Sequence, residues 1–266
     1  MRIVVCIKQV PDTNEVRINQ ETGTLIRTGV PSIMNPDDKN ALEEALTLKD
    51  KYGAEVVVIT MGPLQAKEIL NEALSMGADR AYLISDRKFG GSDTWATATI
   101  LAAAIEKVGN YDIVFCGRQA IDGDTAQVGP EIAEFLGLPQ ITYVKSIELK
   151  ENSTLEVCRF TEYGDYIYHV QMPVVLTAIK ELNVPRYPTI SGIIQNYGEE
   201  KKENIETIDF SNLPVDETQI GLKGSPTNVL KSFVPVKNKV SEIIEGDTAK
   251  EKTDKLVMKL SAIHLI

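Results

Sequence analysis

Short apolar runs alternate with longer amphipathic stretches through the first 117 residues of the chain. The runs are rich in β-branched residues and predict strands buried on both faces, at 2–8, 54–62, 80–85 and 111–117. The stretches between them carry apolar residues at helical spacing and predict helices at 35–53, 63–77 and 93–109. Because strands separated by helices form right-handed crossovers, this pattern predicts an α/β fold with a doubly wound, mostly parallel sheet.

The pattern changes after about residue 140. Apolar runs joined by short turns predict antiparallel additions that extend the sheet, at 140–150, 154–160, 166–172 and 174–180. Residues 181–194 contain prolines and little periodicity, and residues 195–247 are polar and irregular. We therefore divide the chain into an α/β domain, residues 1–194, and a C-terminal arm without a core of its own, residues 195–266.

The arm ends in a predicted helix. Thr248 and Glu251 have the spacing of a capping box. An apolar stripe follows, formed by Leu256, Val257, Leu260 and Ile263. Such a stripe needs a covering surface, either on the sheet of this chain or on another chain.

Composition and charge exclude several classes of function. Hydrophobic residues make up 43% and charged residues 25% of the 266 residues, which is ordinary for a globular protein. The net charge of −10 argues against a nucleic-acid partner. Three cysteines without C-x-x-C spacing and two distant histidines argue against a disulfide framework or a metal site. The N-terminus enters a strand pattern directly, and no apolar run has membrane-spanning length, so we expect a cytoplasmic protein without a membrane partner.

Ligands of open α/β sheets bind at the carboxyl ends of the strands. Four loops lie there: after Lys8, at Met61-Gly62, at 86–94 and at 117–130. The last reads GRQAIDGDTAQVGP. It contains neither the G-x-G-x-x-G fingerprint nor a Walker A loop.

The glycines and polar residues of this last loop predict an anion site. Gly117 lets the chain leave the strand tightly, and Gly123 permits a backbone conformation or a close ligand approach that other residues bar. If Asp124 or Thr125 caps the next helix, the N–H groups of residues 125–128 face an anion, usually a pyrophosphate. Composition alone leaves open the alternative of a capped loop that binds nothing.

The GGSDT at 90–94 partly resembles the S-G-G-x-D-S loop of ATP pyrophosphatases. That loop belongs after the first strand, whereas GGSDT follows the third, and we discount this class of enzyme. The alternative is a glycine turn in which Asp93 caps the next helix.

Over essentially its whole length the chain resembles the β subunit of an electron-transfer flavoprotein. The resemblance rests on VVCIKQVPD, SIMNPDDKNALEEAL, ALSMGADRAYL, GRQAIDGDTAQVGP, PVVLTAIKELNVPRYPTISGI and the final amphipathic helix. It implies an adenine-nucleotide α-hydrolase-like fold. The implied nucleotide contacts are Cys6, Asn35, Asp37, Asp38, Met61, Gly117, Arg118, Gln119, Ala120, Ile121, Asp122, Gly123, Asp124, Thr125, Ala126, Gln127 and Val128.

Two local features resemble the electron-bifurcating branch of that family. Members that only shuttle electrons hold AMP and carry bulkier acidic residues at the position of Gly123, whereas bifurcating members hold a second FAD. GGSDTWATA resembles the bifurcating branch and adds Asp93, Thr94 and Thr97 to the implied cofactor contacts. The alternatives are a carrier subunit with structural AMP and a nucleotide sensor of the universal-stress type.

The resemblance also implies the chemistry. NADH passes a hydride to the FAD of this subunit. One electron goes to ferredoxin or flavodoxin, and the other goes to the α-subunit FAD and a flavin-dependent dehydrogenase of the acyl-CoA, enoyl-CoA or lactate type. The same machinery can run in reverse. We find no candidate catalytic acid, base or nucleophile in this chain, so the predicted site is a cofactor cradle.

The resemblance implies two partner surfaces. Residues 183–194 correspond to the loop that docks on the dehydrogenase, with Arg186, Tyr187 and Ile190 as partner contacts. The alternative is a surface loop with Ile190 in the protein's own core. The arm and its final helix are expected to embrace the α subunit.

Overall fold

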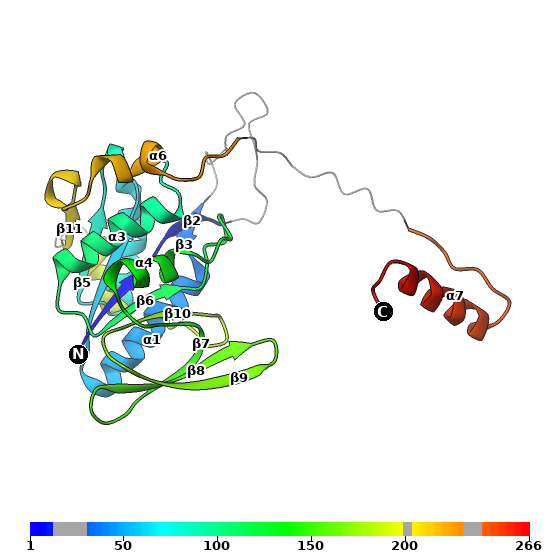
Figure 1. The fold of residues 1–266 in the computed structure, drawn as a ribbon. Coiled ribbons are helices and arrows are strands. Elements are labelled where there is room, and N and C mark those ends of the chain that lie inside the picture. Colours follow the sequence, from blue (N-terminus) through cyan, green and yellow to red (C-terminus); the bar gives the residue numbers. More distant parts are fainter. Residues whose placement is uncertain (13–30, 199–203, 231–240) are drawn as a thin grey trace.

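The computed structural model describes residues 1–12, 31–198, 204–230 and 241–266. A nine-stranded sheet forms its centre (Figure 1), in the order β11-β5-β4-β1-β6-β10-β7-β8-β9. The strands are β1 (Arg2–Cys6), β4 (Glu55–Met61), β5 (Arg80–Ile84), β6 (Ile113–Gly117), β7 (Gln140–Leu149), β8 (Thr154–Thr161), β9 (Gly164–Gln171), β10 (Val174–Ala178) and β11 (Ile205–Ile208). A separate two-stranded ribbon pairs β2 (Gln9–Pro11) with β3 (Ser32–Met34). The loop predicted after Lys8 continues into residues 13–30, which lie outside the described residues.

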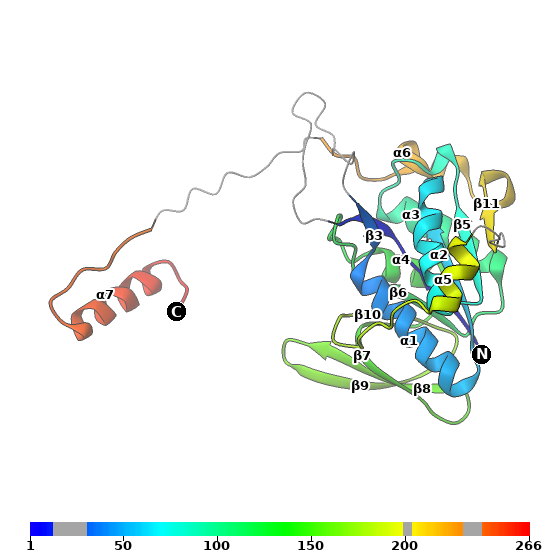
Figure 2. The ribbon, with the colours of Figure 1, turned by 180° about the vertical axis from the view of Figure 1, so that it is seen from behind.

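Helices cover both faces of the sheet. The chain forms α1 (Pro36–Tyr52), α2 (Lys67–Met76), α3 (Thr94–Val108), α4 (Val128–Leu136), α5 (Ile190–Tyr197), α6 (Gly221–Gly224) and α7 (Ala249–Ala262). Short 3-10 turns lie at η1 (Leu64–Ala66), η2 (Arg87–Phe89), η3 (Phe210–Asn212) and η4 (Glu217–Gln219). Figures 1 and 2 show α3 and α4 on one face and α1, α2 and α5 on the other. The predicted doubly wound α/β fold is confirmed.

Alternate residues of the central strands build two separate cores. On β1, Ile3 and Val5 pack in the core that α1 and α2 cover, whereas Val4 and Cys6 pack in the core that α3 and α4 cover. All of these side chains are buried. Because β1 has an apolar residue at each of these positions, it reads as a continuous apolar run, which is typical of a parallel strand with helices on both faces.

The prediction of antiparallel additions after residue 140 is right for β8 and β9 and wrong for β10. β8 pairs antiparallel with both β7 and β9. β10 pairs in parallel with β6 on one side and with β7 on the other, and all five of its residues are buried. Short connecting turns suggested hairpins, but β10 returns to the interior of the sheet, where its apolar run is covered on both faces.

Two segments predicted to be irregular contain regular structure. The end of the 181–194 stretch begins α5, whose N-cap Thr189 accepts a hydrogen bond from the backbone N–H of Gly192. Further on, β11 adds a parallel strand beside β5. Three apolar residues after residue 204 are buried in the α3-side core, namely Ile208, Leu213 and Ile220. Parts of the predicted arm, 199–203 and 231–240, lie outside the described residues.

The C-terminal helix is confirmed as α7. Thr248 is its N-cap and accepts a hydrogen bond from the N–H of Glu251, as the capping-box spacing predicts. Figures 1 and 2 show α7 apart from the sheet, and no residue of α7 is buried. Among the described helices, none combines the length and apolar character needed to cross a membrane.

Candidate functional site

The strand order reverses at β1, and this reversal marks the candidate site. From β1 the chain moves to β4 and β5 on one side, whereas β6 lies on the other side. Cys6 and Cys116, near the carboxyl ends of β1 and β6, are register partners. Open α/β sheets bind ligands at such a reversal, beyond the carboxyl ends of the strands. The predicted loops after β1 and β6 therefore lie side by side here.

Asp38, at the start of α1, fastens the ends of these two strands. Its carboxylate accepts hydrogen bonds from the backbone N–H groups of Lys8 at 2.7 Å and Gly117 at 3.0 Å. A Cβ added to Gly117 would lie 2.2 Å from Asp38 Oδ1 and 2.6 Å from Asp38 N. The chain therefore needs glycine at 117 because α1 approaches so closely, and this contact explains the residue better than the tight exit from the strand that we predicted.

Asn35, the residue before α1, holds the loop after β6. Its side-chain amide donates to the carbonyl of Gln119 at 2.9 Å, and its Oδ1 accepts from the N–H of Ile121 at 3.1 Å. Asn35 is completely buried. Asn35 and Asp38 thus lie next to the predicted 117–128 loop, and their side chains bond to the backbone of that loop and of Lys8.

Burial raises the pKa of Asp38 to about 7, against hydrogen bonds from Asn35, Lys8 and Gly117 that favour the carboxylate. Between the ordinary value of 3.8 and about 7, the folded state keeps a proton that the unfolded chain has released. The free energy of unfolding should therefore fall as pH rises through this window, by at most about 1.4 kcal/mol per pH unit from this group.

Asp38→Asn should remove this part of the pH dependence. The variant loses some stability at every pH, because one amide oxygen replaces two acceptor oxygens, but its slope against pH should be shallower than that of the wild type. Urea unfolding at about pH 5.5, pH 6.5 and pH 7.5 measures both slopes. Equal slopes would contradict a proton on Asp38.

Two further carboxylates of the site are paired with cations. Arg118 Nε lies 3.4 Å from Asp37 Oδ2, and its guanidinium lies over the Tyr143 ring, 5.7 Å from the centroid. Burial raises the pKa of Asp37, and the charge of Arg118 opposes this shift. Lys8 Nζ lies 2.6 Å from Asp122 Oδ1 and ties the end of β1 to the loop.

The loop itself differs from the prediction in its backbone. The N–H groups of Gly123 and Asp124 both donate to the carbonyl of Ala120, and the Asp124 carboxylate accepts from the Gln119 side chain. Positive φ occurs at Asp124 and Ala126, both at 55°, and Gly123 has ordinary φ. A Cβ added to Gly123 meets no atom of the described residues within 4 Å. Gly123 therefore does not need the backbone freedom of glycine. The structure leaves open space where its side chain would lie.

The helix after this loop begins at Val128, with Gln127 as its N-cap. The predicted caps Asp124 and Thr125 are wrong, since they lie before the N-cap, and Gln127 makes no side-chain capping bond to the described residues. The first backbone bond of the helix runs from the N–H of Glu131 to the carbonyl of Gln127. The N–H groups of Val128 and Gly129 precede it and have no partner within the helix, and Pro130 has no N–H. Thr125 is exposed.

Asp93 caps α3, as the glycine-turn alternative predicts. Its Oδ1 accepts from the N–H of Ala96 at 3.0 Å. Its Oδ2 accepts from the N–H and the hydroxyl of Thr227 at 2.9 and 2.7 Å, and its own N–H donates to Ser225 Oγ at 2.9 Å. Burial acts to raise the pKa of Asp93, but these hydrogen bonds outweigh it and hold the pKa below its ordinary value. Both carboxylate oxygens are thus engaged within the chain, by the helix and by the arm.

The N-termini of α3 and α4 meet at this end of the sheet. The Thr94 hydroxyl donates to Glu131 Oε1 at 3.1 Å, and burial raises the pKa of Glu131. The other carboxylate oxygen, Oε2, is buried and makes no hydrogen bond to the described residues. Thr97 is half-buried one turn further along α3, where its N–H bonds to the Asp93 carbonyl.

The remaining predicted contacts lie at strand ends. Met61 ends β4 and is half-buried, and Cys6 ends β1 and is buried. A hydrogen bond with Cys6 and burial raise the pKa of the Cys116 thiol. All three cysteines are free thiols, and Cys6 and Cys116 serve here as small apolar residues.

The chain is similar in sequence to proteins of one known family. The electron transfer flavoprotein domain matches residues 22–213 of the chain. The chain is 57% identical over 266 residues to the electron transfer flavoprotein subunit beta of Thermoanaerobacterium thermosaccharolyticum, with 100% of both chains covered. The chain belongs to the electron transfer flavoprotein family, among its beta subunits.

Two further relatives align over the full length of both chains. The chain is 52% identical over 267 residues to the caffeyl-CoA reductase-Etf complex subunit CarD of Acetobacterium woodii. It is 48% identical over 274 residues to the acryloyl-CoA reductase electron transfer subunit gamma of Anaerotignum propionicum. The names of both relatives link them to reductases of CoA thioesters.

The region expected to dock in an electron transfer flavoprotein is exposed on this chain. Tyr187 is 90% and Ile190 81% exposed, so Ile190 does not lie in the protein's own core. Arg186 differs from these two residues, since its side chain forms ion pairs with Glu43 and Asp50 of α1.

Sequence reasoning missed four residues at the site. Lys8 lies two residues after the buried strand β1, and this position at the carboxyl end of a strand was the signal that could have identified it. Glu131, Ser225 and Thr227 carry no local signal, because each comes to the site only through contacts with residues 37 to 134 positions away.

Proposed function

We propose that this chain is the β subunit of a heterodimeric electron-transfer flavoprotein and binds FAD at the β1/β6 reversal. The observation that carries the proposal is Gly123, whose α-carbon faces open space on the loop between β6 and α4. The open space suits a long cofactor. A bound flavin supplies hydride exchange with NADH and transfer of single electrons.

The backbone at the start of α4 fits the phosphate part of such a cofactor. The N–H groups of Val128 and Gly129 have no partner within the helix, and the helix dipole adds a partial positive charge there. Val128 is half-buried, whereas Gly129 is buried, so the N–H of Val128 is the first that an anion would meet. Asn35 and Asp38 hold the loop in place before the cofactor binds. The cradle is therefore preorganised.

Three carboxylates of the cradle are paired or hydrogen-bonded within the chain. Asp37 is paired with Arg118, and Asp122 is paired with Lys8. Asp38 points its oxygens at two backbone N–H groups. These carboxylates are thus neutralised or bonded within the chain, which reduces their repulsion of an incoming anion.

The proposal includes three classes of partner. The names of the relatives support a flavin-dependent dehydrogenase of the acyl-CoA or enoyl-CoA type, and a lactate dehydrogenase type stays as an alternative. Ferredoxin or flavodoxin takes the other electron. The α subunit covers the apolar stripe of the C-terminal segment, where Leu256 and Val257 of α7 and the C-cap Ile263 are all exposed.

The nucleotide content of the purified heterodimer tests the proposal. The chain is co-expressed with its α subunit, and released nucleotides are separated by chromatography and counted per heterodimer. Two FAD per heterodimer support an electron-bifurcating subunit, whereas one FAD and one AMP support a subunit that only carries electrons. ATP bound to a homodimer of this chain would overturn both and support a nucleotide sensor.

Ile190→Asp tests the docking part of the proposal. Loss of an exposed apolar anchor should raise the KM of an acyl-CoA dehydrogenase for the heterodimer roughly 30-fold, the scale of an interface hot spot. NADH oxidation with a small dye as acceptor should be unchanged. The control is Tyr163→Ala, because Tyr163 is a 92% exposed aromatic residue on the β8–β9 turn. An unchanged KM for Ile190→Asp would remove Ile190 from the interface.

A further inference from the structure

We propose that Arg186 is a positioning residue that fixes the docking loop, residues 183–194, on α1 and makes no contact with the dehydrogenase itself. The inference rests on the proposed function, in which this loop meets the partner. It assigns to Arg186 a role different from that of Tyr187 and Ile190, although all three lie in the same loop.

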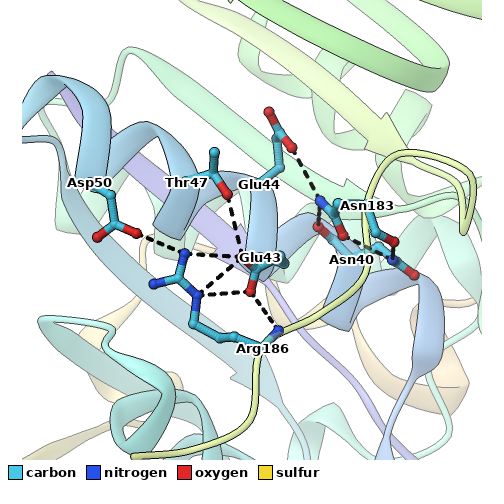
Figure 3. Close-up of polar contacts among 7 residues, drawn as sticks. All are labelled: Asn40, Glu43, Glu44, Thr47, Asp50, Asn183 and Arg186. Carbon is cyan, nitrogen blue, oxygen red and sulfur yellow. Dashed lines mark hydrogen bonds and ion pairs between the residues drawn. The ribbon is translucent and has the colours of Figure 1, made fainter.

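The contacts of Arg186 run inward, to α1 (Figure 3). Its Nε lies 2.9 Å from Glu43 Oε2, its Nη2 lies 3.0 Å from Glu43 Oε1, and its backbone N–H donates to Glu43 Oε2 at 2.8 Å. Nη2 also lies 2.8 Å from Asp50 Oδ2. Planar, two-point pairing of guanidinium with carboxylate is the strongest geometry for such a pair.

The Glu43 carboxylate is suited to act as an anchor. Its side chain is 9% exposed, whereas that of Asp50 is 60% exposed. A buried carboxylate that loses its cation is left charged in a poorly solvated place, so the pair resists separation. Arg186 would have to abandon this partner in order to reach across an interface.

A second set of hydrogen bonds fixes the loop one turn away on α1 (Figure 3). Asn40 and Asn183 bond reciprocally. The side-chain amide of Asn40 donates to the backbone carbonyl of Asn183 at 2.9 Å, and the side-chain amide of Asn183 donates to the backbone carbonyl of Asn40 at 3.0 Å. Asn183 also donates to Glu44 Oε2 at 3.1 Å. The loop is thus held on both sides of Val184, which is 90% exposed.

These attachments explain how apolar side chains stay exposed. Tyr187 lies between the Arg186 attachment and α5, and Ile190 is the first residue of α5. This helix packs on α2, with Gly192 against Ser75. A loop held at both ends loses little conformational entropy when a partner binds, and this lowers the cost of association.

The helix that holds the loop also builds the cofactor site. Asp38 and Glu43 lie five residues apart on α1, which is about 7.5 Å along the helix axis. One rigid element therefore sets the position of the docking loop relative to the cradle. Arg186 would therefore affect how the dehydrogenase docks relative to the cofactor without contacting the dehydrogenase.

A double-mutant cycle tests the assignment with the intact heterodimer and a short-chain acyl-CoA dehydrogenase as probe. Arg186→Gln should raise the KM of the dehydrogenase for the heterodimer about 10-fold and leave kcat and dye-linked NADH oxidation unchanged. In the background Glu43→Gln/Asp50→Asn, where Arg186 has lost both carboxylates, Arg186→Gln should add less than about 2-fold. A further 10-fold loss in that background would mean that Arg186 contacts the partner and would overturn the proposal.

Hydrogen–deuterium exchange gives a readout that needs no partner. The amide hydrogens of Asn183, Val184, Arg186, Tyr187 and Thr189 should exchange faster in Arg186→Gln. Arg186→Lys, which keeps the charge but lacks the planar fork, should restore protection only in part. Unchanged exchange in Arg186→Gln would overturn the proposal. If instead the loop loosens as expected while Ile190→Asp leaves the KM unchanged, the docking function fails and the positioning of the loop by Arg186 stands.

Discussion

Gly117→Ala is expected to destabilise the protein by about 3 kcal/mol or more. The added Cβ would lie 2.2 Å from Asp38 Oδ1, 2.6 Å from Asp38 N and 2.7 Å from the carbonyl carbon of Asp37. Two of these atoms are backbone, so no side-chain rotation relieves the overlap. Relief requires α1 and β6 to move apart and break the hydrogen bond between Gly117 N–H and Asp38. Urea unfolding followed by the fluorescence of the single tryptophan, Trp95, measures the loss.

Gly123→Ala is the matched control on the same loop. Its Cβ meets no atom of the described residues within 4 Å, and its φ is ordinary, so its free energy of unfolding should change by less than about 0.5 kcal/mol. If both alanine variants unfold at the same urea concentration as the wild type, the close approach of α1 to β6 is wrong.

Gly123→Asp is expected to abolish FAD binding at the β1/β6 reversal while leaving the fold intact. The carboxylate would fill the open space beside the loop and add a negative charge where we expect a pyrophosphate. We expect the affinity for this FAD to fall by about 100-fold or more, roughly 3 kcal/mol. The FAD and AMP contents of the purified heterodimer, with its NADH oxidation rate, give the measurement.

Gly123→Asn separates size from charge, because it has nearly the shape of aspartate without the charge. Loss of FAD in both variants would assign the effect to space, and loss in Gly123→Asp alone would assign it to repulsion. Unchanged FAD content and NADH oxidation in Gly123→Asp would place the cofactor elsewhere.

The sequence was sufficient where the determining interactions are local or periodic. The apolar runs of β1, β4, β5 and β6 are buried on both faces, and such runs are distinctive without any knowledge of neighbours. The rule that ligands bind at the carboxyl ends of parallel strands then selected the loops after β1 and β6, and the structure places these loops side by side.

The sequence was insufficient where a side chain is used by a distant segment. Asp93 meets Thr227 across 134 positions, and Arg186 meets Glu43 across 143. No local pattern indicates either pair, so these contacts could not be predicted, and the roles predicted for Asp93 at the cofactor and for Arg186 at a partner stay predictions. β10 was misassigned for a related reason, since its neighbours β6 and β7 are decided by the whole sheet.

The bond between Thr227 and Asp93 determines where this chain can be shortened. One carboxylate oxygen of Asp93 accepts a hydrogen bond from the first turn of α3, and the other accepts one from Thr227. A truncation before residue 225 would remove Ser225 and Thr227 as well as α7, and it would return one Asp93 oxygen to solvent at the edge of the cradle. A truncation after residue 230 would remove α7 and keep the hydrogen bonds between Thr227 and Asp93. Only the second truncation separates loss of the terminal helix from damage to the candidate cofactor site.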